Sequence, residues 1–190
     1  MERKIEQRRI KNILQGEPKH LTERTKVRIL GIDPGTLIMG YGVIDEEDGE
    51  IALVDCGALT ASDAPLAQRL HTLYLGLVDI IARYQPAEGA IEEPFVAKNA
   101  RSALLVGQAM GVAMVAMAGK GIPVYRYTPN QVKLAVTNYG HSGKEQVQKM
   151  VGIQLGLSSP PQPSDAADAL AVAICHIQER RLSRMTANSR

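Results

Sequence analysis

A run of branched apolar residues that ends in an acid and a Pro-Gly turn constrains the fold of this chain more than any other stretch does. Residues 27–32 read Val-Arg-Ile-Leu-Gly-Ile and are followed by Asp33, Pro34 and Gly35. Valine, isoleucine and leucine favour a strand, and Pro-Gly cannot continue one. We therefore expect Asp33 at the carboxyl tip of a strand, where its carboxylate can face a cleft instead of the core. The alternative is an aspartate that starts the turn through its own side-chain hydrogen bonds.

Two further strands are expected directly after this turn. Residues 39–45 alternate as a strand does, and residues 51–59 are again rich in branched apolar side chains. The polar segment between them contains Asp48-Gly49, a hairpin signal. Strands joined in this way should be antiparallel.

The rest of the chain alternates between helical and strand patterns. Apolar residues from Leu66 to Ile81 recur at spacings of three and four, which predicts a helix that Pro65 opens and that ends before Pro86. The further expected elements are a strand at 89–92, a helix from its cap Asn99 to about Gly119, a strand at 122–127, and helices at 129–136, at 142–155 with Ser142 as cap, and from Ser164 onward. This order predicts an α/β fold with a mixed five-stranded sheet, in which three antiparallel strands precede β-α crossovers and helices flank both faces.

Four acids fall where this fold would bring them together. The first and fourth strands can lie side by side and parallel, so that Asp33 and Glu92 emerge at the same edge of the sheet. Asp165 and Asp168 are three residues apart at the start of the last helix, hence on one face. Four converging carboxylates repel one another unless cations lie between them, and Mg²⁺ or Mn²⁺ suits oxygen ligands. Taken singly, each acid could instead be an ordinary strand-end or first-turn helix residue.

The helix after Asn99 is rich in alanine, glycine and methionine. Gly107 and Gly111 lie four residues apart on it, hence on one face. Small residues permit the close approach of a second helix, so we expect this helix to be buried or to form a subunit interface.

Charge is distributed unevenly over the 190 residues, although the net charge is only +2. Residues 1–28 carry nine Lys or Arg and four Glu, residues 179–190 carry four Arg and one Glu, and the body between them has nine basic and fifteen acidic residues. A polyanion bound by the body must therefore be held through local patches and metal ions. We expect a flexible basic N-terminal extension at 1–26, one globular domain at 27–178 and a basic C-terminal tail at 179–190.

The N-terminal extension, the cysteines and the histidines say less about function than the four acids do. Residues 1–26 are interpreted as a disordered segment or the product of an upstream start codon, with a basic arm that contacts nucleic acid as the alternative. Cys56 and Cys175 lie in apolar runs without a metal-binding spacing, which favours reduced core residues of a cytosolic protein. No apolar run of membrane-spanning length and no secretory signal is recognisable. The four histidines are scattered without evident partners.

Several short motifs, in order and with compatible spacing, resemble the RuvC family of bacterial Holliday-junction endonucleases. They are Gly-Ile-Asp-Pro-Gly-Thr at 31–36 with Gly-Tyr-Gly at 40–42, Ala-Ile-Glu at 90–92 with Phe-Val-Ala-Lys-Asn at 95–99, Gly-Gln-Ala at 107–109 with Gly111, and Asp-Ala-Ala-Asp-Ala-Leu-Ala at 165–171. The resemblance extends from about Val27 to His176 and leaves residues 1–26 outside it.

The resemblance implies a ribonuclease-H-like fold and a homodimer that cuts four-way DNA junctions by paired, symmetric nicks. It implies two Mg²⁺ ions per active site, with Mn²⁺ as a substitute, and the catalytic, metal-binding acids Asp33, Glu92, Asp165 and Asp168. Asp33 would bridge the two ions, one activating a water molecule and the other stabilising the leaving 3′-oxygen. The resemblance further implies DNA recombination and repair in the bacterial cytoplasm, at the nucleoid, with the branch-migration proteins RuvA and RuvB as partners.

The same resemblance implies DNA contacts. Phe95, the single phenylalanine of the chain, matches an aromatic that engages bases near the junction centre, with a core position as the alternative. Lys133 and Lys144 match basic residues near the scissile strand. Lys98 and Arg101 lie where they could contact phosphates beside the cleft, although a solvated face is the alternative.

The chain departs from the family pattern in two places. Some members carry histidine where this chain has Asp165, which leaves the role of the fourth acid open. Glu93-Pro94 replaces the commoner sequence after the catalytic glutamate, and Pro94 could shift the loop that aims Phe95.

Two other function classes remain as alternatives. Gly-Ile-Asp-Pro-Gly-Thr at 31–36 also resembles the first phosphate loop of actin-like ATPases and sugar kinases, but those proteins need two lobes and a glycine-rich adenosine loop. A catalytically silent junction-binding protein would keep the fold without cutting. The presence of all four acids argues against it.

Overall fold

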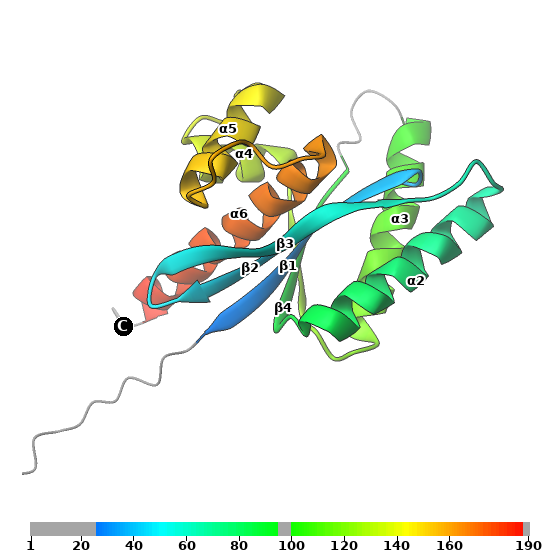
Figure 1. Ribbon diagram of the computed structural model, residues 1–190, viewed down its shortest axis with the longest axis horizontal. Coiled ribbons are helices and arrows are strands. Elements are labelled where there is room, and N and C mark those ends of the chain that lie inside the picture. Colours follow the sequence, from blue (N-terminus) through cyan, green and yellow to red (C-terminus); the bar gives the residue numbers. More distant parts are fainter. Residues whose placement is uncertain (1–25, 95–99, 188–190) are drawn as a thin grey trace, which may run out of the picture.

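The computed structural model describes residues 26–94 and 100–187, which form one mixed sheet with helices on both faces (Figure 1). The strands are β1 (Val27–Asp33), β2 (Ile38–Glu47), β3 (Glu50–Thr60), β4 (Glu88–Glu92) and β5 (Val124–Tyr127). Their order across the sheet is β3-β2-β1-β4-β5. The first three are antiparallel neighbours, whereas β4 runs parallel to both β1 and β5. The expected five-stranded α/β sheet is thus confirmed.

The helices divide between the two faces of this sheet. On one face lie α2 (Leu66–Tyr84) and α3 (Ala100–Ala118), and on the other lies α6 (Ser164–Ala187), with α4 (Pro129–Thr137) and α5 (Lys144–Gln154) packed against it (Figure 1). Successive side chains of a strand point to opposite faces. Leu30 and Ile32 of β1 therefore join the cluster under α2 and α3, while Ile29 joins the cluster under α6. Burial on both faces explains the nearly continuous apolar sequence of β1.

Glycines on β1 and β2 allow α6 to lie directly on the sheet. A Cβ atom at Gly31 would lie 2.1 Å from the carbonyl oxygen of Ala169, and one at Gly40 would lie 2.0 Å from that of Asp165. No side chain fits at these distances, so only glycine permits this approach. Gly40 pairs with Asp33 in the antiparallel ladder. The start of α6 is thereby fixed beside the carboxyl end of β1.

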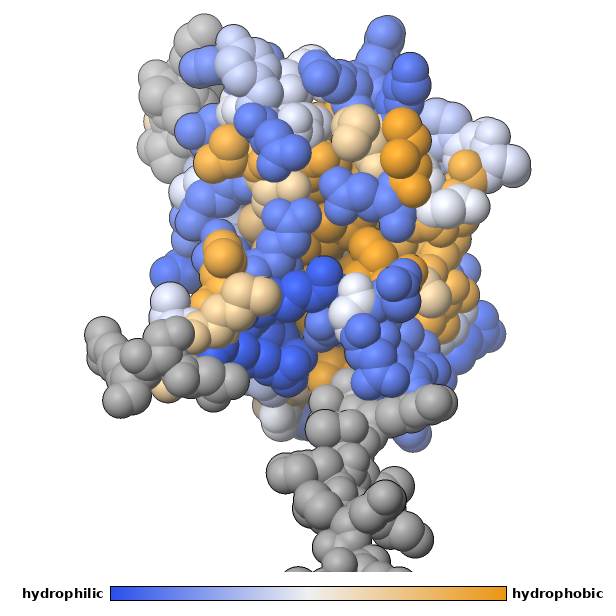
Figure 2. Space-filling view, turned by 90° about the vertical axis from the view of Figure 1, so that its left-hand side faces the viewer, coloured by the Kyte–Doolittle hydropathy of each residue, from blue (hydrophilic) through white to orange (hydrophobic). Residues whose placement is uncertain are grey.

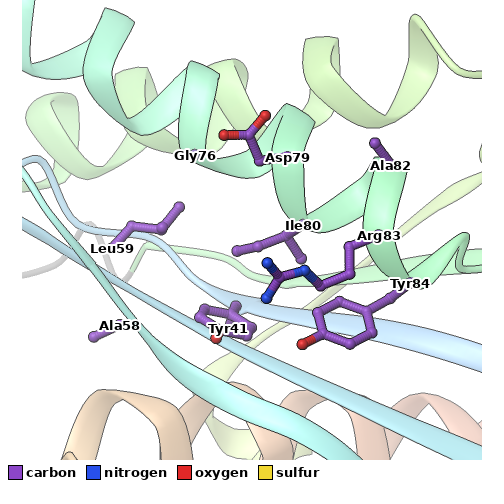
Figure 3. A pocket seen from close by; sticks show the side chains of 9 residues that line it. All are labelled: Tyr41, Ala58, Leu59, Gly76, Asp79, Ile80, Ala82, Arg83 and Tyr84. Carbon is purple, nitrogen blue, oxygen red and sulfur yellow. The ribbon is translucent and has the colours of Figure 1, made fainter.

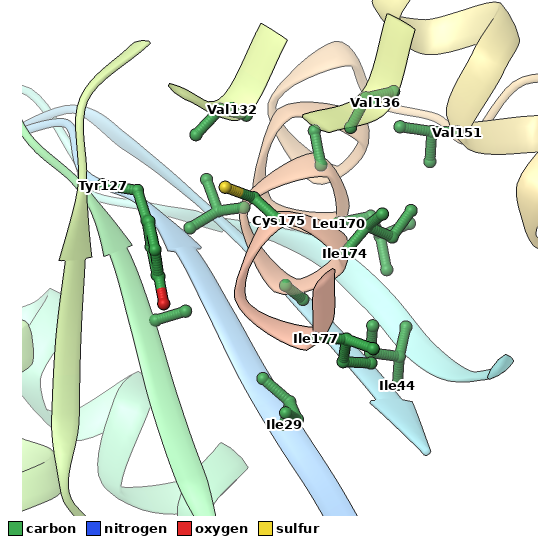
Figure 4. Packing of buried hydrophobic residues seen from close by; sticks show 14 of the residues in the cluster. Ile29, Ile44, Tyr127, Val132, Val136, Val151, Leu170, Ile174, Cys175 and Ile177 are labelled. Carbon is green, nitrogen blue, oxygen red and sulfur yellow. The ribbon is translucent and has the colours of Figure 1, made fainter. Parts of the chain in front are cut away.

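The core under α6 holds this helix in place from several sides. Ile29 and Ile44 of the sheet share one buried cluster with Ile177 of α6, and Ile177 lies beside Ile44 (Figure 4). Val136 of α4 and Val151 of α5 belong to the same cluster on the outer side of the helix. Each of these aliphatic side chains, when fully buried, contributes about 1.5–3 kcal/mol relative to an exposed position. The apolar run 169–177 is buried throughout, because α6 is enclosed between the sheet and two shorter helices.

Two local expectations are corrected by the structure. The cap of α5 is Gly143 and not Ser142, whose hydroxyl instead donates a hydrogen bond to the carbonyl oxygen of Tyr139. Both cysteines are free, and Cys175 is buried as expected. Cys56 is only half-buried because it lies on the edge strand β3.

The last helix continues beyond the point where the sequence indicates a separate tail. α6 extends through Ala187, and Arg180 and Arg181 both form ion pairs with Glu46 of β2. Figure 2 views the molecule from the end where the β2–β3 hairpin and the C-terminal end of α6 lie in Figure 1, and hydrophilic residues make up much of this face. Positively charged residues after 179 therefore serve the fold over at least part of this segment.

Candidate active site

Two parallel strands bring the first pair of acids to one edge of the sheet. Ile32 of β1 pairs with Ile91 of β4, and Asp33 and Glu92 are the next residues on each strand. Both are the last residues of their strands. The expected placement of the two acids at a common edge is therefore confirmed, because both strands end there in the same direction.

The second pair of acids reaches this edge from α6. Asp165 is the second residue of the helix, and its backbone lies against Gly40, the ladder partner of Asp33. Asp168 follows three residues later and lines a hollow together with Glu92. We refer to Asp33, Glu92, Asp165 and Asp168 as the four acids. They come from two strand ends and one helix start, which the fold holds against one another.

The electrostatics of the strand-end acids reflect this gathering. Burial, followed by the negative charges of Asp168 and Asp165, raises the pKa of Asp33 to about 6. Burial, followed by the charges of Asp33 and Asp168, raises the pKa of Glu92 to about 7. Both causes disfavour the charged form, the first by removing water and the second by repulsion. The site therefore holds more negative charge than its own surroundings offset.

Two lysines oppose this excess of negative charge. The Lys144 Nζ atom lies 2.6 Å from a carboxylate oxygen of Asp168, and this hydrogen bond raises the pKa of Lys144. The positive charge of Lys133 lowers the pKa of Glu92 and so offsets part of its rise. The hollow has a volume of about 240 Å³ and is lined by Glu92, Pro129, Val132, Lys133, Lys144, Val147, Asp168 and Ala171. Both lysines implied by the family resemblance thus lie at the site of the acids.

The donor atoms of the four acids suit a hard divalent cation. All are carboxylate oxygens, the ligands that Mg²⁺ and Mn²⁺ prefer, and the buried charge excess is the kind that such an ion offsets. Among residues 26–94 and 100–187, no three acids, histidines or cysteines form a ready metal-binding group. In the arrangement described, the Lys144 ammonium takes an oxygen of Asp168 instead. The residues fit the ion in type and charge, and their spacing would have to tighten around it.

Of the remaining predicted DNA contacts, Arg101 alone lies among the described residues. Arg101 is exposed in the first turn of α3 and does not line the hollow of the acids. Phe95 and Lys98 fall in the segment 95–99, outside the described residues, as do the predicted cap Asn99 and the extension up to residue 25. Their proposed roles therefore rest on the sequence.

A buried polar network that sequence reasoning missed lies at the other end of β4. His176 of α6 shares a 2.7 Å hydrogen bond with the hydroxyl of Tyr127 and a 2.6 Å hydrogen bond with Glu88, which also accepts from Arg180. The expectation that the histidines lack partners is thus wrong for His176. The signal was its position inside the apolar run of the last helix, where a polar side chain needs a partner.

A second hollow, of about 740 Å³, lies between α2 and the strands β2 and β3 and has a different chemistry (Figure 3). Tyr41 and Tyr84 both donate hydrogen bonds to Asp55 there, and Arg83 lies over the ring of Tyr84. Asp79 contributes the single acid among its lining residues. Asp55 already accepts from both tyrosine hydroxyls, and the lining holds a single acid, so the hollow at Glu92 and Asp168 is the stronger candidate for catalysis despite its smaller volume.

Comparison with known families gives a consistent result. The family described as "Crossover junction endodeoxyribonuclease RuvC" matches residues 29–176. A protein of that name from Chloroflexus aggregans is 55% identical over 151 residues, which cover 79% of this chain and 92% of the relative. One from Dehalococcoides mccartyi strain 195 is 49% identical over 161 residues, covering 84% and 98%.

Solved structures agree with the sequence relatives. The structure described as "T. thermophilus RuvC in complex with Holliday junction substrate" superposes with a TM-score of 0.77 at 35% identity, covering 83% of this chain and 96% of that chain. The yeast mitochondrial Holliday junction resolvase Ydc2 superposes with a TM-score of 0.63 at 14% identity, covering 85% and 84%, and supports the fold alone.

Proposed function

Because this chain belongs to the RuvC family of crossover junction endodeoxyribonucleases, we propose that it resolves Holliday junctions with the four acids as its catalytic centre. The observation that carries this proposal is the meeting of two parallel strand ends with the start of α6, which gathers buried acids beside two lysines. We assign the reaction to DNA recombination and repair in the bacterial cytoplasm, at the nucleoid, with RuvA and RuvB as partners.

Two Mg²⁺ ions per active site, replaceable by Mn²⁺, would be held by the four acids Asp33, Glu92, Asp165 and Asp168. When bound, such ions make hydroxide available near neutral pH and offset the charge on the leaving 3′-oxygen. The chain's own residues fix the geometry. The ends of β1 and β4 supply two rigid carboxylates, and the first turn of α6 supplies the other two. In-line attack of hydroxide on the phosphorus atom would break its bond to the 3′-oxygen. The products would be 5′-phosphate and 3′-hydroxyl ends.

Basic and aromatic side chains around the acids would hold the DNA. Lys133 and Lys144 line the hollow and are placed to contact the phosphates that flank the cut. Arg101, exposed at the start of α3, would contact phosphate further away. Lys98 is proposed as another phosphate contact from the sequence alone. Phe95 would stack on bases near the junction centre. The first four contacts fix position, whereas the aromatic selects an opened junction over continuous duplex.

A homodimer through α3 would supply the second active site that paired nicks need. Leu104 and Val115 of this helix are 65% and 64% exposed, and a Cβ atom at Gly107 or Gly111 would meet nothing within 4 Å. Among the described residues, α3 is also long and apolar enough to cross a membrane, a test that helices of soluble proteins can pass as well. A second copy covers this apolar face while leaving the four acids of each protomer open.

The proposal is tested with the purified full chain and a synthetic four-way junction. With Mg²⁺ we expect paired nicks on opposing strands, and with Ca²⁺ we expect binding without nicks. A linear duplex of the same sequence should stay uncut. Binding without nicks under both ions would support a catalytically silent junction-binding protein. Tight Mg-ATP binding by calorimetry would instead favour the actin-like class, although the described residues supply one sheet where that class needs two lobes.

A further inference from the structure

Lys144 makes the shortest contact between opposite charges at the four acids. Its Nζ atom lies 2.6 Å from Asp168 Oδ2. The Lys144 side chain is 56% exposed, whereas that of Asp168 is 20% exposed. The acid is thus fixed in the site, and the lysine reaches it from the solvent side. A long, exposed lysine can leave such a contact without any change in the backbone.

The position of Lys144 in its helix adds a second observation. Lys144 is the first residue of α5, directly after the cap Gly143. A positive charge at a helix N-terminus is opposed by the helix dipole, so helix stability does not explain a lysine there. The acids on α6 and the open mouth of the hollow do explain it, because both lie within reach of this side chain.

The ammonium occupies an oxygen that a divalent cation needs. Asp168 cannot offer that oxygen fully to an ion while it holds Lys144, and two positive charges at one carboxylate repel each other. Lys133 lines the same hollow but forms no ion pair with any acid of the described residues. The two lysines therefore differ in their contacts. Lys144 pairs with Asp168, whereas Lys133 is available for a DNA phosphate.

We propose that Lys144 is a competing counter-ion that keeps divalent cations weakly bound until DNA arrives. The inference rests on the proposed function of the four acids. In the free protein Lys144 pairs with Asp168, and in the complex its ammonium moves to a DNA phosphate and releases the acid. Junction binding and cation binding then strengthen each other by the same factor, as linkage requires. Without DNA, the enzyme would thus bind its metal ions weakly. It would acquire the ions needed for nicking only after a junction has bound.

The test measures Mn²⁺ binding directly, by titration calorimetry on the full chain without DNA. Lys144→Met removes the competitor, so its Mn²⁺ affinity should rise about tenfold over wild type. Lys144→Arg keeps the charge and should stay near wild type. Lys149→Met removes an exposed lysine from the same helix, away from the hollow, and serves as the matched control. Lys144→Gln replaces the Met variant if that variant unfolds.

A second arm adds a four-way junction with phosphorothioate linkages that resist cutting. In wild type the junction should raise Mn²⁺ affinity more than it does in Lys144→Met, because only wild type has a competitor to release. The same Mn²⁺ affinity in Lys144→Met and wild type, or a weaker one in the variant, overturns the inference. If neither protein binds Mn²⁺, or if Asp33→Asn binds it as wild type does, the proposed metal site itself fails instead.

Discussion

At the scale of single residues, burial and neighbouring negative charges raise the pKa values of Asp33 and Glu92 above those of surface carboxylates. The pKa of Asp33 is raised to about 6 and that of Glu92 to about 7, first by burial and then by neighbouring acids. A divalent cation opposes both causes, since it supplies positive charge and new ligand contacts in place of lost water. Perturbed acids in a hollow with basic side chains are typical of a functional site.

Replacement of Asp33 by asparagine should separate cutting from binding. Loss of one carboxylate disturbs the ions, so nicking should fall about a thousandfold or more. Junction binding should persist, because the phosphate-contacting surface is unchanged. Nicking assays and gel shifts measure the two effects. Asp79→Asn, on the exposed side of α2, is the control and should cut normally. A parallel loss of binding in Asp33→Asn would show that the acid is structural.

The raised pKa values also predict how stability depends on pH without divalent ions. The unfolded acids release protons near pH 4, whereas the folded ones keep them until about pH 6 and 7. The folded state therefore binds more protons in between, and stability should fall by roughly 5 kcal/mol as pH rises from 4 to 7.5. Urea unfolding in chelator measures this. Mg²⁺ and Asp33→Asn should each reduce the loss, and an equal loss in Asp33→Asn would contradict the assignment.

At the scale of elements, the sequence predicted the strands and helices well, because each is specified by side-chain patterns and turn residues within a short stretch of chain. The apolar run before Asp33, the Asp48-Gly49 turn and the spacing from Leu66 to Ile81 each act over a few residues. The joint edge of β1 and β4 followed from element order. The fold could therefore be derived almost completely, as could the gathering of the four acids.

Pairings across long sequence distances could not be derived in this way. Lys144 meets Asp168 because α5 packs on α6, and His176 meets Glu88 and Tyr127 because α6 lies on the sheet. No spacing rule links positions that the fold brings together from different elements. Glycines along β2 were visible in the sequence, but their purpose became clear only from the 2.0 Å clearance at Gly40.

The contact at Gly40 should be necessary for both folding and cutting. In Gly40→Ala the new methyl group would collide with the carbonyl oxygen of Asp165, so α6 would have to shift away from the sheet. We expect a loss of about 3 kcal/mol in unfolding free energy and reduced nicking by the remaining folded protein. Gly143→Ala, where a Cβ atom meets nothing within 4 Å, is the control, with a cost of at most about 1 kcal/mol. Equal stability of the two variants would contradict the close packing.

At the scale of the whole molecule, α3 presents an exposed apolar face. Its residues Leu104 and Val115 are more exposed than most apolar side chains of the described residues, while Ala109, Ala113 and Met117 face the core. One stripe of the helix is thus used within the protomer, and the opposite stripe is available to another copy. A resolvase that nicks two strands symmetrically needs such a pairing.

Charge placed on the outer stripe of α3 should separate the protomers. Leu104→Glu and Val115→Glu should each weaken the dimer at least about a hundredfold, because a buried carboxylate would face apolar surface. Sedimentation over a concentration series measures this, and thermal unfolding checks that each protomer stays folded. Leu75→Glu, at a similarly exposed position on α2, should leave the dimer intact. Unchanged association of the α3 variants would place the interface elsewhere.

The two ends of β4 have different roles, one in holding α6 on the sheet and the other in the proposed metal-dependent reaction. Glu88 at one end is paired with Arg180 and His176, while Glu92 at the other end carries a raised pKa that the proposed divalent ions would counteract. Under the proposed function, a shortage of magnesium would therefore stop cutting, while the pairing that secures α6 would persist because it needs no ion.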